Sequence, residues 1–187
     1  MTPEPNSAAW WDTVASRYDA AGDDRDRPQE FAAISSYCIP GPVVEIGCAF
    51  GAFREYVPDG VAYCGVDISP AMVERARLWR PFSLFIVADV LDPPTCLLGA
   101  FKTAVACQVL EHMPDLDAAI GAIRRLATEN LVVTVPRGAR TPEAQATDGH
   151  VRAWEDETAL AADLGRFGAV KTIHVVPHHI AAALTWE

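Results

Sequence analysis

Lysine is nearly absent from this sequence, and acidic residues outnumber basic ones. Among the 187 residues, Lys102 and Lys171 are the only lysines, and 15 Lys and Arg stand against 25 Asp and Glu, which gives a formal net charge of −10. Binding to duplex nucleic acid depends largely on neutralising phosphates with Lys and Arg. The composition therefore argues against a DNA or bulk RNA partner, although a local cluster of arginines is still compatible with it.

Three further patterns are missing. No run of about 18 apolar residues is present, so we expect no membrane-spanning helix. The first residues, MTPEPNSAAWWD, lack both the basic and the apolar stretch of a secretory signal. The five cysteines include no CxxC pair, which argues against a zinc site and a disulfide framework. We therefore predict a cytoplasmic protein without a metal ion.

Half of the residues are hydrophobic, which is enough for one domain with a single core. Apolar residues at helical spacing predict helices over 8–21 and 29–38, and Pro-Gly-Pro at 40–42 ends this N-terminal part. We therefore divide the one compact domain into a helical segment, residues 1–40, and an α/β unit, residues 41–187.

Strands and helices alternate from residue 43 onward. The last two predicted strands, 169–176 and 180–186, lie so close in sequence that they must be antiparallel, because a parallel pair needs a crossover of about a dozen residues or more. We predict an α/β sandwich with five parallel strands, an antiparallel hairpin at one edge and helices on both faces. Apolar patterning predicts the parallel strands over 43–46, 61–67, 83–89, 101–108 and 131–136, and helices over 52–57, 69–79, 115–129 and 155–168.

The residues that end the parallel strands are the first candidates for a site, because ligands bind there in open parallel sheets. Gly47 and Gly51 follow the first strand and remove Cβ where backbone approaches a ligand or where a helix packs tightly on a strand. Asp67 ends the second strand, where a carboxylate can accept hydrogen bonds from both ribose hydroxyls. Asp89 ends the third strand, where it suits the exocyclic amine of adenine.

The charge of Glu45, within the first strand, decides which nucleotide suits this site. A pyrophosphate prefers a helix N-terminus without a nearby carboxylate. Glu45 instead favours a cation, so the residues together point to adenosine with a positive tail. Two simpler interpretations stay open, in which Asp67 caps the following helix and Asp89 is an ordinary turn residue.

Histidines provide the candidate general bases, because imidazole titrates near neutral pH. His112 follows Glu111 in the turn after the fourth strand, and His150 precedes Arg152 in the long polar loop over 136–153. Loops of this length in compact domains are often lids or binding loops. The simpler interpretation of these residues is a capped turn and a solvated lid.

Four stretches resemble, in this order, the successive motifs of class I S-adenosylmethionine-dependent methyltransferases: VVEIGCAFGAF, GVDISPAMVERAR, VADV and QVLEHM. WWDTVASRYDAA resembles the N-terminal helix that covers the cofactor in small-molecule members, and GHVRAWEDETALAADLGRFG is similar to the stretch before their last crossover helix. The resemblance spans about residues 10–187. It implies a Rossmann-like fold with a mostly parallel seven-stranded sheet and an antiparallel last strand, with residues 1–40 capping the cofactor site of residues 41–187.

The resemblance also assigns roles to residues. At Ala49 the family usually has glycine, so the extra methyl group either reduces the room for the cofactor or is tolerated at a negative φ. The resemblance places Glu111 at the border of the acceptor site, where the residues themselves also suggest Trp11 and Trp154 as apolar walls and Arg152 as a contact from the long loop. The cofactor-binding positions it implies are Tyr18, Glu45, Gly47, Ala49, Gly51, Asp67, Ile68, Asp89, Val90 and Gln108.

The implied activity is transfer of a methyl group from S-adenosylmethionine to oxygen or nitrogen of a small molecule, with S-adenosylhomocysteine as product and no metal ion. His112 and His150 are the candidate catalytic residues, and we expect a monomer or a homodimer. Two alternatives stay open. One is a methyltransferase that acts on a specific RNA or protein site, which a concentrated arginine surface would favour. The other is a non-catalytic cofactor-binding or partner subunit, which a pocket filled by side chains would favour.

Overall fold

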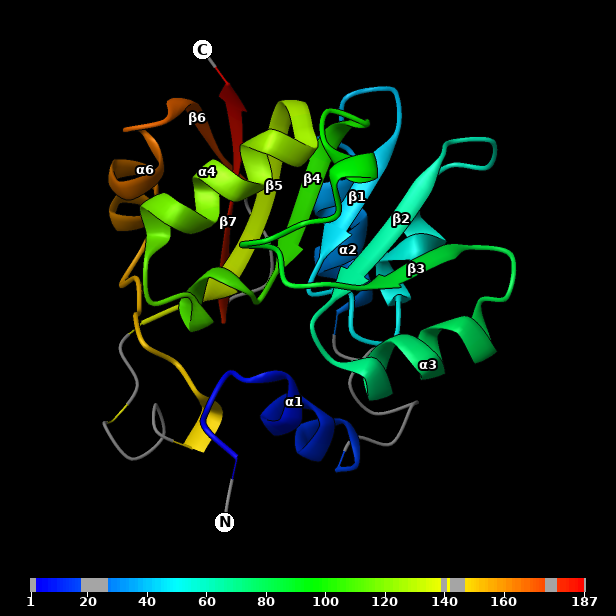
Figure 1. The fold of residues 1–187 in the computed structure, drawn as a ribbon. Coiled ribbons are helices and arrows are strands. Elements are labelled where there is room, and N and C mark those ends of the chain that lie inside the picture. The colour runs from blue at the N-terminus through cyan, green and yellow to red at the C-terminus, as the bar shows by residue number, and fades with distance from the viewer. Residues whose placement is uncertain (1–2, 18–26, 139–140, 142–146, 174–177, 187) are drawn as a thin grey trace.

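Seven strands form one mixed sheet in the order β3-β2-β1-β4-β5-β7-β6 (Figure 1). The computed structural model describes residues 3–17, 27–138, 141, 147–173 and 178–186. Strands β1 to β5 are all parallel, whereas β7 runs antiparallel to both β5 and β6, which confirms the predicted fold class. The strands are β1 (Val43–Ile46), β2 (Tyr63–Asp67), β3 (Leu84–Val87), β4 (Phe101–Cys107), β5 (Ala127–Pro136), β6 (Gly168–Ile173) and β7 (His179–Trp186).

Helices cover both faces of the sheet, with α4 in front of it and α2 behind it in Figure 1. On one face Ile120 of α4 and Leu164 of α6 share a core with Val44 of β1. No helix within the described ranges is long and apolar enough to cross a bilayer. The helices are α1 (Ala8–Ala15), α2 (Pro28–Ser35), α3 (Pro70–Trp79), α4 (Leu116–Leu126) and α6 (Glu157–Leu164), with 3-10 turns η1 (Ala52–Tyr56), η2 (Thr95–Leu97) and η3 (Leu110–His112).

The start of α3 follows directly from its sequence. The Ser69 hydroxyl accepts a hydrogen bond from the Met72 N–H at 3.1 Å, and Pro70 occupies the first helical position, where its missing N–H has no cost. The Ser69 cap is therefore confirmed. Because β2 ends at Asp67, this cap fixes the Asp67 carboxylate beside the N-terminus of α3.

The end of α4 differs from its prediction, because the helix stops at Leu126 instead of residue 129. Ala127 already pairs with Phe101 of β4, and its carbonyl accepts a hydrogen bond from Trp186 Nε1 at 2.8 Å. These long-range contacts extend β5 back to Ala127. Such sheet pairing outweighs local helix propensity, which is only a weak determinant of secondary structure.

Helix α1 lies across the ends at which the parallel strands finish, below the sheet in Figure 1. The Asp12 carboxylate accepts hydrogen bonds from the Ser69 hydroxyl at 2.5 Å and from the Ala71 N–H at 3.1 Å, both at the start of α3. Arg75 of α3 donates to the carbonyl of Ala15 at 2.8 Å. Polar contacts from the middle and the C-terminal end of α1 therefore attach it to the start and the middle of α3.

Helix α2 has a different position from α1. The ring of Phe31 packs edge-on against those of Phe53 and Tyr56 of η1, with centroids 5.7 and 5.4 Å apart. These residues belong to the core on the sheet face opposite α4. Of the two helices in the predicted 1–40 cap, α1 thus covers the strand ends, whereas α2 supports the sheet.

Candidate functional site

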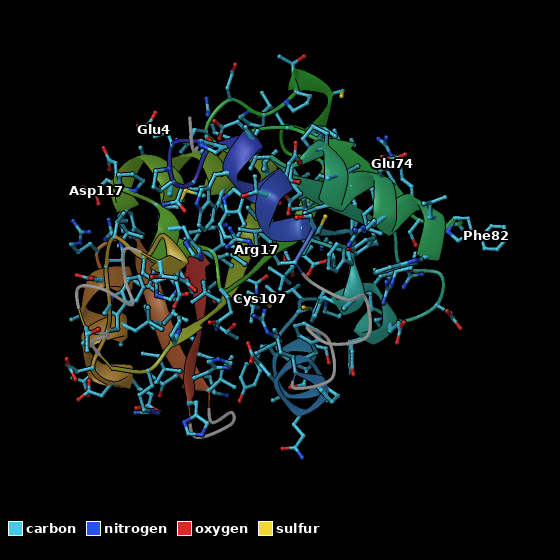
Figure 2. All side chains as sticks on the ribbon, turned by 90° about the horizontal axis from the view of Figure 1, so that it is seen from below. Glu4, Arg17, Glu74, Phe82, Cys107 and Asp117 are labelled. Atoms are coloured by element: carbon cyan, nitrogen blue, oxygen red, sulfur yellow. The ribbon has the colours of Figure 1, made fainter. Side chains whose placement is uncertain are left out.

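A cavity of about 880 Å³ lies between α1 and the ends of the parallel strands. Its walls are α1 with the residues before it, the turns that follow β1 to β4, and the loop around His150. Figure 2 views the molecule from this side, with α1 in front of the strands and the labelled Arg17 and Cys107, both cavity residues, near the middle. The strand order reverses between β1 and β4, which is where ligands bind in open α/β sheets.

Gly47 and Ala49 line the cavity directly after β1. Gly47 has a φ of 63°, and a Cβ atom there would lie 2.5 Å from Cγ2 of Val109, so only glycine fits. Ala49 has a φ of 44°, in the left-handed region that alanine seldom adopts. The negative φ considered for Ala49 is therefore excluded, and this turn keeps a strained alanine.

Gly51 serves packing and is not among the residues that line the cavity, so its role in cofactor binding stays a prediction. Its φ is 75°, and a Cβ atom would lie 2.5 Å from the ring of Phe85. Glycine at this position therefore allows η1 to start close against β3. Of the two uses that the sequence left open for this residue, tight packing is the one that the geometry supports.

Asp67 lines the cavity, and both of its carboxylate oxygens accept hydrogen bonds from backbone. Ala49 N–H donates to Oδ2 and Ser69 N–H donates to Oδ1, each at 2.9 Å. Burial raises the pKa of Asp67 to about 6; the backbone hydrogen bonds oppose this shift and the charge of Asp12 adds to it. An ionised carboxylate has about four acceptor positions, so two remain for ligand hydroxyls.

Glu45 is not among the residues that line the cavity, so its contact with the cofactor stays a prediction. Its carboxylate accepts a hydrogen bond from the Tyr63 hydroxyl, and the side chain is 4% exposed. Side chains alternate between the two faces of a strand, and Glu45 lies on the same face as Val43, the register partner of Tyr63. This face is covered by the core that contains Val43 and Phe53.

Ile68, Asp89 and Val90 line the cavity at the ends of β2 and β3, as expected for one end of a ligand. Asp89 is exposed, and its Oδ1 accepts a hydrogen bond from the Leu91 N–H at 2.9 Å. Asp89 therefore makes the hydrogen bond of an ordinary turn residue, as the simpler interpretation expects. The same carboxylate still faces the cavity, so its contact with adenine stays a prediction.

The other end of the cavity contains Gln108 and a group of aromatic and imidazole rings. Gln108 has a φ of 57°, and its side chain donates to the Thr134 hydroxyl at 3.2 Å. The ring of His112 lies edge-on to Trp11 and to His150, with centroids 4.9 and 4.8 Å away. Glu111 borders the cavity beside them although it is only 1% exposed.

Two of the predicted acceptor-binding residues do not reach the cavity. Arg152 donates from Nε and Nη2 to the Met113 carbonyl at 3.1 and 2.9 Å, and so fixes the turn after η3. Trp154 is 3% exposed and donates from Nε1 to the Asp163 carboxylate at 2.9 Å. These side chains fix the loop, whereas their neighbour His150 lines the cavity, and an acceptor contact of Arg152 or Trp154 stays a prediction.

Sequence reasoning missed the residues that close the site. Asn6 Nδ2 donates to the carbonyls of Gly149 at 2.7 Å and His112 at 3.3 Å, and thereby joins the N-terminal segment to both imidazole-bearing turns. Arg17 and Arg27 also line the cavity and bring positive charge to it. No local pattern identifies these residues, because their partners are far away in sequence. The predicted site residue Tyr18 lies outside the described residues.

Comparison with known proteins agrees with this geometry. A family model described as a methyltransferase domain matches residues 44–132, which include the glycine turn, Asp67 and Gln108. The chain is 30% identical over 148 residues to nodulation protein S of Sinorhizobium fredii, covering 74% of this chain and 63% of that protein. It is also 30% identical over 107 residues to the ubiquinone biosynthesis O-methyltransferase of Xanthomonas oryzae pv. oryzae, covering 54% of this chain and 45% of that enzyme.

Solved structures extend the similarity to almost the whole fold. The magnesium protoporphyrin IX methyltransferase of Synechocystis PCC 6803 with bound S-adenosylmethionine superposes with a TM-score of 0.64 at 17% identity, covering 94% of this chain and 96% of that chain. The chain spans less than two thirds of either curated relative. The matched family model and the strand order of the sheet nevertheless agree with the motifs in the sequence. Residues 44–132 therefore match a methyltransferase domain, and the chain has the Rossmann-like fold of the class I S-adenosylmethionine-dependent methyltransferases.

Proposed function

We propose that this protein transfers a methyl group from S-adenosylmethionine to oxygen or nitrogen of a small-molecule acceptor. One observation carries the proposal: a single cavity joins the Gly47 turn and Asp67 at one end to His112 and His150 at the other. Such a cavity brings a donor bound at the first end into line with an acceptor bound at the second.

The described residues suit this cofactor. The Gly47–Ala49 turn would lie under the methionine part, and the two remaining acceptor positions of Asp67 would take the ribose hydroxyls. Ile68 and Val90 offer apolar surface to the adenine, and Asp89 would accept from its amine. When bound, the cofactor supplies a methyl group on a positively charged sulfur.

Methyl transfer from such a sulfur asks the protein mainly for alignment and exclusion of water. Helix α1 lies over the cavity and would help to exclude water from it when the ligands are bound. A hydroxyl acceptor must also lose its proton, and His112 or His150 would accept that proton while the acceptor oxygen forms its bond to the methyl carbon. Both imidazoles border the cavity, and Trp11 beside them offers apolar surface for the acceptor.

A small acceptor agrees better with the site than RNA or protein does. Arg137 pairs with Glu157, and Arg152 donates to backbone carbonyls, so both guanidinium groups have internal roles. The third arginine considered for a polymer surface, Arg140, lies outside the described residues. The relative named for ubiquinone biosynthesis is by its name an O-methyltransferase, which supports oxygen as the methylated atom.

A non-catalytic role is the less favoured alternative, because an open cavity of about 880 Å³ is not filled by side chains. We also propose that the protein works in the cytoplasm, in keeping with five free cysteines. A monomer is sufficient for this proposal, because the residues proposed for the cofactor and for the acceptor all belong to one chain.

Calorimetric titration with S-adenosylhomocysteine tests the proposal. The wild-type protein should bind one equivalent, and Asp67→Ala should weaken binding roughly 100-fold, because it removes the acceptor of two ribose hydrogen bonds. Asp92→Ala is the matched control: it removes an exposed carboxylate on the neighbouring turn, outside the cavity walls. Wild-type affinity in Asp67→Ala would remove the ribose assignment, and failure of the wild type to bind would remove the proposal.

A further inference from the structure

Three side chains at the acceptor end of the cavity form a set of metal-ligand type. Glu111, His112 and His150 each offer one ligand atom, and these atoms all lie within 4.8 Å of one another. The absence of a CxxC pair had led to the prediction of no metal, but that argument addressed only cysteine sites. We infer that these three residues bind a divalent transition-metal ion.

The hydrogen bond of His112 orients its ring for this task. Nδ1 lies 3.2 Å from the Gly149 carbonyl oxygen, which can only accept, so Nδ1 carries the proton. The lone pair is then on Nε2, which lies 3.9 Å from Oε1 of Glu111. A metal-binding histidine almost always donates its other N–H to a carbonyl or carboxylate in this way, which fixes both tautomer and orientation.

Backbone contacts bring the two ligand-bearing segments together. Val151 N–H donates to the Glu111 carbonyl at 2.8 Å, and Asn6 bridges the carbonyls of His112 and Gly149. The set is therefore held by contacts on both sides of His150. The three ligand atoms, which lie within 4.8 Å of one another, need to approach only slightly to bind an ion. A tetrahedral ion with bonds of about 2.1 Å separates its ligand atoms by about 3.4 Å.

The burial of Glu111 also suits a cation. Its side chain is 1% exposed, and a neighbouring positive ion offsets part of the cost of removing a carboxylate from water. Two imidazoles and one carboxylate are ligands that Zn²⁺ and other divalent first-row metals accept in sites with open coordination positions. With three protein ligands, the remaining positions would face the cavity.

This placement gives the ion a role that rests on the proposed function. A hydroxyl bound to the ion would lose its proton at lower pH, so that the acceptor oxygen reaches the methyl carbon as an alkoxide or phenoxide. The proton passes to solvent, and no histidine is then required as a base. Binding of the ion itself does not depend on the identity of the acceptor.

The test uses the full chain after treatment with a chelator. Calorimetry with Zn²⁺ should reveal one site, and Co²⁺ should give the visible absorption of an ion with nitrogen and oxygen ligands, without thiolate bands from the exposed Cys96. His112→Ala, His150→Ala and Glu111→Gln should each weaken Zn²⁺ binding by more than about 100-fold, since each removes a direct ligand. His178→Ala, which removes an exposed imidazole outside the cluster, is the control and should bind as the wild type does.

Thermal unfolding and two titrations decide whether the metal site exists. Zn²⁺ should raise the melting temperature of the wild type and not that of His150→Ala, whose folding is checked by circular dichroism. Absence of a one-to-one site in the wild type, or equal affinity in His150→Ala, would overturn the inference. S-adenosylhomocysteine titrated into the same samples separates the proposals: if it binds while Zn²⁺ does not, only the metal site fails, and the reverse result removes only the proposed function.

Discussion

The carboxylate of Asp12 accepts a hydrogen bond from the hydroxyl of Ser69, with 2.5 Å between the two oxygens. Ser69 in turn donates its N–H to Asp67, so a continuous chain of hydrogen bonds joins α1 to the carboxylate proposed for the ribose. Asp12 also places a negative charge at the N-terminus of α3, where the helix dipole favours it. Two hydrogen bonds of Ser69, one to Asp12 and one to Asp67, therefore connect α1 above the cavity to the strand end that lines it.

We predict that Asp12→Ala lowers both stability and cofactor affinity. Loss of the hydrogen bonds from Ser69 and Ala71 should reduce the free energy of unfolding by about 1–3 kcal/mol, measured by urea unfolding. Affinity for S-adenosylhomocysteine should fall by about tenfold, since part of the binding energy must then restore α1 to its closed position. Glu74→Ala, on the exposed side of α3 (Figure 2), should change neither quantity. An unchanged affinity in Asp12→Ala would mean that cofactor binding does not need α1.

Asp67 should make the ligand-free protein less stable as pH rises. Its pKa of about 6 in the folded protein exceeds the ordinary value of 3.8, so between these values the folded state binds more protons than the unfolded state. The free energy of unfolding therefore falls across that interval, by about 3 kcal/mol in total for this group. Asp67→Asn cannot titrate, so the difference between wild-type and variant stability should fall from about pH 4 to pH 7. Parallel pH curves for the two proteins would contradict this account.

Ala49→Gly should stabilise the protein, against the usual effect of glycine. The left-handed backbone at Ala49 costs an alanine about 1–2 kcal/mol, and glycine avoids that cost while losing about 0.5–1 kcal/mol through chain entropy. A net gain of up to about 1.5 kcal/mol should appear in urea unfolding, without loss of affinity for S-adenosylhomocysteine. Ala118→Gly, at an exposed position of α4, should instead lower stability. A loss in both variants would show that the turn at Ala49 is not strained.

The fold and the cofactor end of the site were predictable because their signals are local. Strand ends, the capped helix at Ser69 and the Gly47 turn all appear in short stretches of sequence, and parallel strands bring their carboxyl ends to one edge. The face of a strand is harder to predict, since Glu45 belongs to a strand that is buried on both sides. For the same reason the sequence could not separate its packing role from a ligand contact.

The acceptor end was less predictable because it depends on contacts between distant residues. His150, Arg152 and Trp154 follow one another in a loop, and nothing in that spacing indicates that only His150 faces the cavity. Trp154 is directed inward by Asp163, and Asn6 reaches Gly149 across 143 positions of sequence. Such pairings become visible only once the chain is folded.

The close approach of Gly149 to Asn6 provides the last prediction. A Cβ atom at Gly149, where φ is 73°, would lie 2.5 Å from Asn6 Oδ1 and 3.2 Å from the Trp10 ring. Gly60→Ala is a matched control, because its φ of 82° is equally unfavourable but no atom lies within 4 Å of the added carbon. Both variants should lose about 1–2 kcal/mol of unfolding free energy from backbone strain, and Gly149→Ala should lose a further 1–3 kcal/mol or so from the clash.

Because that clash separates His150 from His112, Gly149→Ala should also weaken Zn²⁺ binding in calorimetry, whereas Gly60→Ala should not. Equal stability and equal Zn²⁺ affinity in the two variants would mean that the contact with Asn6 does not position His150.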